Sequence, residues 1–167
     1  MLSHIVCALS LAVFYILQTT IFSRTTLVAG TADIILVFLA AWSLHEKIKN
    51  SWLWAGIAGF LISMVSAMPY FAPLVGYLGV IGISKLLQRR VWRIPIIAMF
   101  IVTLLGSVFQ NFLYMITLII QGTPISWGES LDAVIVPSIL LNLIFALPMF
   151  AVVTGLVDRI FPLEENE

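Results

Sequence analysis

Residues 94–120 read IPIIAMFIVTLLGSVFQNFLYMITLII, a run of 27 residues without a charged side chain. Crossing about 30 Å of hydrocarbon takes about 20 helical residues, because an α-helix rises about 1.5 Å per residue. This stretch is therefore long enough to span a membrane with some tilt. The whole chain has the same character, since 62% of its 167 residues are hydrophobic and only 10% are charged. Soluble domains are about half apolar and a quarter charged, so the sequence predicts an integral membrane protein.

Five further apolar runs accompany this one, separated by short polar connections. The six predicted spans are residues 5–22, 31–44, 53–68, 71–87, 94–120 and 134–157. The longest connection, residues 121–133, is too short to form a soluble domain. We therefore expect an all-α fold in which residues 1–167 form a single transmembrane domain, a compact bundle of six helices.

The basic residues are distributed unevenly between the two sides of this predicted bundle. Seven of the eight follow the second, fourth and sixth spans: Lys47, Lys49, Lys85, Arg89, Arg90, Arg93 and Arg159. Only Arg24 lies in an opposite loop. Short loops rich in Lys and Arg stay in the cytoplasm, so both termini are predicted to be cytoplasmic. The net charge of zero argues against a nucleic-acid partner.

Tryptophans and helix-capping residues refine this map. Trp42, Trp52, Trp54 and Trp92 flank the predicted cytoplasmic ends of spans, where indole rings favour the membrane interface. Asp132 is a plausible N-cap for the last span, and Pro148 lies well inside that span, where it removes a backbone hydrogen bond.

Small residues recur at helical spacing in the third and fourth spans. Helices in a membrane associate through close backbone packing, which small residues permit. We expect helix packing, or the approach of a ligand to bare backbone, at Gly56, Gly59, Gly76, Gly79 and Gly82. Ala8 and Ala12 form a similar pair in the first span.

Polar residues inside the spans fall at similar depth, in the predicted outer half of the bundle. They are Gln18, Asp33, Gln110, Asn111, Ser138 and Asn142. A buried amide in hydrocarbon needs a partner, because each unsatisfied group costs several kcal/mol. Three roles are open for this cluster: hydrogen bonds between helices, a groove for a partner protein, or a pocket for a small ligand.

Asp33 has two further interpretations, because the second span starts at either Leu27 or Thr31. An acidic residue within a span indicates function. Thr31 and Asp33 are also typical of an N-cap and a first-turn acid, which favour the positive end of a helix. Arg24 is close enough in sequence to pair with Asp33.

No residue pattern indicates catalysis. His4 is near the terminus, His45 lies at a predicted helix end, and no Ser, Cys or acidic residue has the spacing of a catalytic triad or a metal site. We expect neither an enzyme nor a bound cofactor or metal. Asp33 alone gives little support to ion transport, which usually needs a chain of intramembrane carboxylates or broken helices.

Three stretches together resemble the MreD family of bacterial rod shape-determining proteins. The first is residues 17–22, LQTTIF, followed by residues 32–36, ADIIL. The second is residues 56–60 with Gly76-Tyr77 and Arg89-Arg90. The third is residues 137–142, PSILLN. The order and number of the predicted helices also resemble this family over nearly the whole chain, although residues 63–68 lack the acidic residue that many members carry there.

The resemblance implies a non-enzymatic subunit of the cell-elongation machinery in the bacterial inner membrane. Such a subunit binds MreC and associates with the RodA glycosyltransferase, its penicillin-binding transpeptidase partner and the MreB cytoskeleton, and so regulates peptidoglycan synthesis. The family is similar in fold to the substrate-binding subunits of energy-coupling-factor vitamin transporters. A vitamin-binding subunit, with Ala8 and Ala12 facing its energising partner, is therefore the alternative function.

Overall fold

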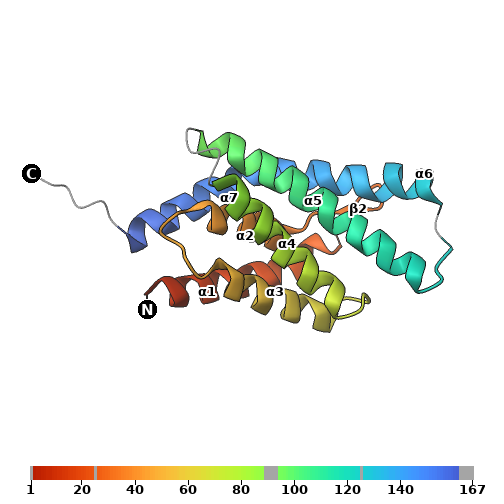
Figure 1. Cartoon of the computed structure of the whole chain (residues 1–167), viewed down its shortest axis with the longest axis horizontal. Coiled ribbons are helices and arrows are strands. Elements are labelled where there is room, and N and C mark those ends of the chain that lie inside the picture. The colour runs from red at the N-terminus through yellow and green to blue at the C-terminus, as the bar shows by residue number, and fades with distance from the viewer. Residues whose placement is uncertain (1, 25, 89–93, 125, 162–167) are drawn as a thin grey trace, which may run out of the picture.

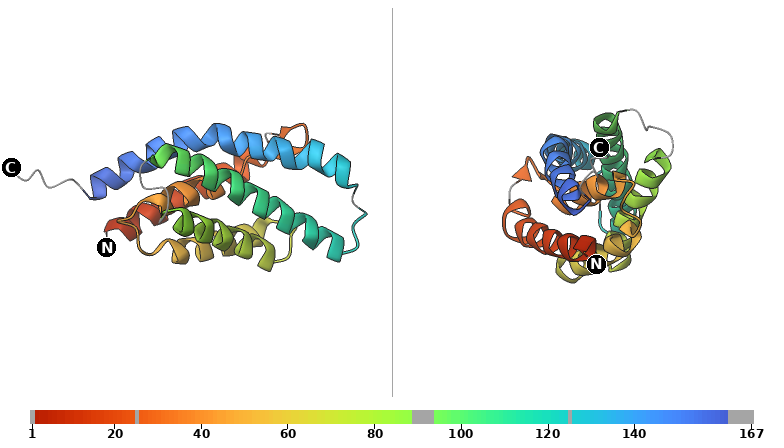
Figure 2. Two further views of the ribbon diagram at one scale, coloured as in Figure 1. Left: turned by 45° about the horizontal axis from the view of Figure 1, so that its top comes forward. Right: turned by 90° about the vertical axis from the view of Figure 1, so that its left-hand side faces the viewer.

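The computed structural model describes residues 2–24, 26–88, 94–124 and 126–161. The long helices run lengthwise along one bundle (Figures 1 and 2). In chain order the elements are α1 (Leu2–Leu17), the π-helical turn η1 (Gln18–Phe22), β1 (Thr26–Leu27), β2 (Gly30–Thr31), α2 (Ile34–Leu44), α3 (Ser51–Val65), α4 (Phe71–Gln88), α5 (Pro95–Ile120), α6 (Trp127–Ser130), the π-helical turn η2 (Leu131–Ile135) and α7 (Val136–Ile160).

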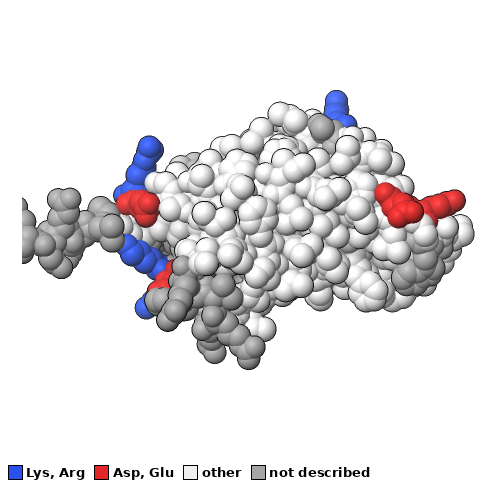
Figure 3. All heavy atoms as spheres, turned by 90° about the horizontal axis from the view of Figure 1, so that it is seen from above, with Lys and Arg blue, Asp and Glu red and all other residues white. Residues whose placement is uncertain are grey.

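Within the part of the chain that the structure describes, four helical stretches are long and apolar enough to cross a membrane. They are Ser3–Phe22, Phe71–Gln88, Pro95–Ile120 and Gly128–Ile160. On the face drawn in Figure 3 most charged side chains lie at the two ends, and one basic side chain projects from the upper edge between them. The chain is thus an all-helical membrane protein. The predicted total of six crossings remains a prediction, because α2 and α3 have only 11 and 15 residues.

The start of α1 and the end of α7 lie at the same end of the bundle (Figure 1). A side-chain contact near the end of α2 supports this placement, since Lys47 Nζ donates to the carbonyl of Phe161, 3.1 Å away. An even number of membrane crossings requires both ends of the chain to lie on the same side of the membrane. The membrane side that they occupy remains a prediction, and Arg89, Arg90 and Arg93 lie outside the described residues.

Helix α2 forms the centre of the bundle. Ten of its residues, Ile34 to Ser43, are buried, and it contacts each of the helices α1, α3, α4, α5 and α7. Its sequence IILVFLAAWSL is apolar around the whole circumference, which is typical of a helix without a solvent face. Eleven residues extend only about 16 Å, which is about half the thickness of the hydrocarbon layer of a membrane.

Neither predicted start of the second span is correct, because α2 begins at Ile34. Before it, β1 and β2 form a short antiparallel ribbon, which pairs Thr26 with Thr31. The ribbon packs on α7 so closely that a Cβ atom on Gly30 would lie 2.6 Å from Ser138 N and from Val134 O. This contact buries Gly30 of β2, whereas both residues of β1 are exposed.

The connection before the last span is also shorter than predicted. Helix begins at Trp127 and continues through η2 into α7. Asp132 lies within η2 and is therefore not the N-cap that the sequence suggested. Pro148 lies inside α7 as expected.

The glycines of α3 and α4 do not form one uniform packing face. A Cβ atom on Gly59 would lie 2.6 Å from Leu74 Cα, and one on Gly79 would collide with the Phe109 ring. Gly82 has only an ordinary contact with Trp52, and Gly56 has nothing within 4 Å. The prediction of close packing is therefore wrong for Gly56, because α3 turns that residue away from its neighbours.

The tryptophans at the predicted cytoplasmic ends differ in exposure. Trp52 is 48% exposed, as an interfacial residue should be, whereas Trp42 is 1% exposed and Trp54 is 8% exposed. Trp42 packs beside Phe38 with ring centroids 5.7 Å apart. It is a core residue because α2 is central, and Trp92 lies outside the described residues.

Candidate functional site

The first turn of α2 lies within the bundle, where its backbone N–H groups need acceptors from other residues. Asp33 is the N-cap, and its Oδ1 accepts from the N–H of Leu36 at 2.9 Å. Gln18 Oε1 accepts from Ile34 N at 2.8 Å, and Gln18 Nε2 donates to Ala32 O at 3.0 Å. One glutamine from η1 thus holds both sides of the chain where it enters α2.

Two side chains of α7 hold the segment that precedes α2. Asn142 Oδ1 accepts from Asp33 N at 2.7 Å, and Asn142 Nδ2 donates to Ser107 Oγ at 2.8 Å. Ser138 Oγ accepts from Thr31 N at 3.1 Å. The spacing of four residues places Ser138 and Asn142 on the same face of α7, and this face meets the backbone of residues 31–33.

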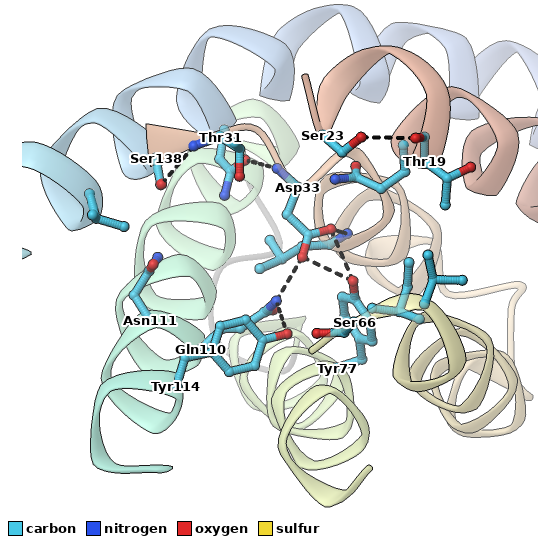
Figure 4. A pocket seen from close by; sticks show the side chains of 16 residues that line it. Thr19, Ser23, Thr31, Asp33, Ser66, Tyr77, Gln110, Asn111, Tyr114 and Ser138 are labelled. Carbon is cyan, nitrogen blue, oxygen red and sulfur yellow. Dashed lines mark hydrogen bonds between the residues drawn. The ribbon is translucent and has the colours of Figure 1, made fainter. Parts of the chain in front are cut away.

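The Asp33 carboxyl group lies at the centre of the network (Figure 4). The Tyr77 hydroxyl from α4 lies 2.9 Å from Oδ2 and 3.1 Å from Oδ1. Gln110 Nε2 from α5 donates to Oδ2 at 2.7 Å and also lies 2.9 Å from the Tyr114 hydroxyl oxygen. The donors Leu36 N, Tyr77 and Gln110 therefore surround one carboxylate, which also lies at the positive end of the α2 dipole.

These contacts replace the ion pair predicted between Asp33 and Arg24. Hydrogen bonds from Leu36 N, Tyr77 and Gln110 satisfy the Asp33 oxygens without a neighbouring cation. Among the described residues that line this region there is no Lys, Arg or His. The sequence suggested Thr31 as the N-cap and Asp33 as a first-turn acid, whereas Asp33 itself is the N-cap, because α2 begins at Ile34.

A cavity of about 340 Å³ adjoins the network, and Figure 4 shows the side chains that line it. Its wall includes Asp33, Tyr77, Gln110 and Tyr114. It reaches the surface beside Val65, which is 59% exposed. The oxygen Gln110 Oε1 is buried and has no hydrogen-bond partner among the described residues. The site therefore combines a polar network, in which Gln110 Oε1 has no described partner, with an open space beside it.

Five of the six polar residues predicted to cluster belong to this network: Gln18, Asp33, Gln110, Ser138 and Asn142. Asn111 lines the cavity, but its amide donates to the Ser107 carbonyl one helical turn earlier, at 2.8 Å. It is therefore beside the network and not part of it, because adjacent residues on a helix differ by about 100° in direction.

Sequence reasoning missed three members, Tyr77, Ser107 and Tyr114. Tyr114 follows Gln110 by four residues, a spacing that places both side chains on one face of α5 and gives a usable signal. Ser107 precedes Gln110 by three residues on the same face. Tyr77 entered only through the resemblance, because one tyrosine in an apolar helix has no local feature that identifies its partner.

The site contains polar groups for binding, but the described residues hold no group of three or more His, Cys, Asp or Glu side chains placed to bind a metal. The arrangement can hold several helices in fixed positions around a cavity at the start of α2. Comparison of the chain with protein-family models, curated proteins and solved structures finds no match.

Proposed function

We propose that the chain is a non-enzymatic scaffold of the bacterial cell-elongation machinery in the inner membrane, with both termini in the cytoplasm. In this proposal it binds MreC and supports peptidoglycan synthesis by RodA and its transpeptidase partner, in association with MreB. One observation carries the proposal. The residues behind the resemblance come from separate stretches of sequence, and Gln18, Asp33, Ser138 and Asn142 meet at the start of α2.

The contacts suggest different roles for the network residues and for the residues at the cavity mouth. The network residues are already bonded to each other, so their contribution is to orient α1, α2, α4, α5 and α7. The residues at the cavity mouth, such as Ser23 and Val65, are exposed and remain accessible to a partner segment. We therefore place the partner at the mouth of the cavity and not at the Asp33 carboxylate.

Co-purification with an MreC-type partner tests the proposal, and a matched pair of variants locates the contact. Val65 lines the cavity and is 59% exposed, whereas Val75 is 41% exposed and lies on α4 outside the cavity lining. Val65→Trp should block the mouth and reduce partner recovery about tenfold or more, the effect of losing about 1.4 kcal/mol of binding. Val75→Trp should leave recovery unchanged. Failure of the wild-type chain to retain the partner would refute the function, and equal recovery with both variants would refute the location.

The vitamin-binding alternative is favoured by the size and lining of the same cavity. Pockets for small molecules usually have volumes of about 300 to 1,000 Å³ and a few convergent polar groups, and this cavity has about 340 Å³. Ala8 and Ala12 are exposed on α1, as a docking face for an energising partner requires. Native mass spectrometry of the purified chain tests this function: a stoichiometric small molecule that is lost in Val65→Trp supports it, and its absence from wild type grown in rich medium opposes it.

A further inference from the structure

A second cavity lies at the opposite end of α2, between the start of α1, the end of α2 and the start of α3. Its volume is about 140 Å³, and its lining includes His4, Trp42, Lys47, Lys49 and Asn50. The volume exceeds the roughly 30 Å³ that one water molecule occupies and is well below the volume of a typical drug-sized pocket. The space therefore suits a small polyatomic group.

One buried polar group of the cavity lining, and another in the residue that follows Asn50 of the lining, have no partner among the described residues. Trp42 lines the cavity and is only 1% exposed, yet its indole Nε1 makes no hydrogen bond. Ser51, the first residue of α3, is fully buried and its hydroxyl is also unpaired. A buried polar group without a partner costs about 1 to 3 kcal/mol. An indole N–H can only donate, so the Trp42 group needs an acceptor.

The start of α3 adds further donors to the same place. The first N–H groups of a helix have no intrahelical acceptor, and Asn50, which precedes α3, makes no side-chain cap. The Asn50 amide instead lies 3.3 Å from His4 Nε2. The 15-residue helix α3 therefore directs the positive end of its dipole toward this region.

The charged side chains that line the cavity are positive, like the end of the α3 dipole that points toward it. Two lysines line the cavity, and its described lining contains no Asp or Glu. Lys47 is engaged, because its ammonium donates to Phe161 O and lies 5.8 Å from the centre of the Phe161 ring. Lys49 is exposed and has no salt bridge or hydrogen bond to a described residue. One lysine therefore remains available for an anion.

We propose that this cavity binds the phosphate of an anionic phospholipid headgroup. Phosphate oxygens accept hydrogen bonds, so they suit a site whose donors are an indole N–H, a helix N-terminus and a lysine. The cavity lies at the end of the bundle where α1 starts and α7 ends (Figure 1). In the predicted orientation this end faces the cytoplasmic leaflet, which carries the anionic lipids. This inference does not depend on the scaffold function.

Lipid binding by the purified full-length chain tests the proposal. Native mass spectrometry with phosphatidylglycerol should detect one tightly retained lipid, and phosphatidylcholine should be retained less. Lys49→Gln should weaken retention of phosphatidylglycerol about fivefold, because one basic residue near a headgroup contributes about that factor. Trp42→Phe removes the indole donor and should weaken it to a similar extent.

Matched controls separate the cavity from general effects. Arg24→Gln removes one positive charge beside η1, at the other end of α1, and Trp52→Phe removes an exposed indole that does not line the cavity. Both should retain the lipid like wild type. Equal retention by Lys49→Gln and Arg24→Gln would overturn the proposal, even if Trp42→Phe failed to fold. Inorganic phosphate tests whether the lipid is the source of the phosphate group. If phosphate alone raised the melting temperature of the wild-type chain as much as the lipid does, but not that of Lys49→Gln, the site would bind free phosphate. The proposal of a lipid headgroup would then be overturned.

Discussion

At the start of α2 the N–H groups of Asp33, Ile34 and Leu36 all have side-chain acceptors. At its other end Gln88 Nε2 donates to the Leu44 carbonyl, 3.1 Å away, while Trp42 Nε1 and Ser51 Oγ have no described partner. The first end is a network drawn from several helices, and its groups largely satisfy one another. The second end has donors in excess. The comparison teaches that the buried polar groups of this bundle serve the fold at one end of α2 and are open to an external acceptor at the other.

The closest packing at the start of α2 gives the largest expected effect. Gly30→Ala would place a Cβ atom 2.6 Å from the backbone of α7, and relieving such overpacking costs about 1 to 3 kcal/mol. Gly82→Ala on α4 is the control, since its Cβ would meet Trp52 at an ordinary 3.6 Å. It should be neutral or stabilise the helix by up to about 1 kcal/mol. Unfolding in detergent measures both, and a Gly30→Ala protein as stable as wild type would show that the ribbon does not dock on α7.

Removal of the Asn142 amide tests whether the network is structural. Asn142→Leu leaves Asp33 N and Ser107 Oγ without their partners, so we expect a loss of about 2 kcal/mol of unfolding free energy. Asn111→Leu is the control, because its amide only adds a bond to a carbonyl in the interior of a helix. That variant should lose less than about 0.5 kcal/mol. Equal losses would place Asn111 in the network and contradict the geometry.

A smaller effect compares hydroxyl groups at the two ends directly. Tyr77→Phe removes a donor to the Asp33 carboxyl group and should cost about 1 kcal/mol, as expected for a typical net hydrogen bond. Ser84→Ala removes the 2.5 Å contact with Ser43, but the Ser43 hydroxyl can still donate to Ala40 O. Its cost should be near the average of about 0.6 kcal/mol for hydrogen bonds between membrane helices. A larger loss from Ser84→Ala than from Tyr77→Phe would contradict the conclusion that polar groups stabilise the fold mainly at the start of α2.

The sequence alone determined the properties that depend on local composition. Uncharged apolar runs predict membrane helices because each residue's transfer into lipid is nearly independent of the rest of the fold. The rise per residue placed Gln18, Asp33, Gln110 and Asn142 at similar depth, and these side chains do meet. Side-chain chemistry also indicated that a helix starts near Thr31 and Asp33, since these residues favour the positive end of a helix, although the N-cap is Asp33 and not Thr31.

Only the tertiary structure decided how the helices are arranged around one another. An apolar run of 11 residues reads as a span, and only packing against five neighbours makes α2 a central helix preceded by a ribbon. The same packing buries Trp42, turns Gly56 outward and separates Gln110 from Asn111. The direction that a residue faces depends on contacts far away in sequence, and lipid and protein interior are equally apolar. Hydropathy therefore cannot distinguish the residue that faces lipid from the residue that faces another helix.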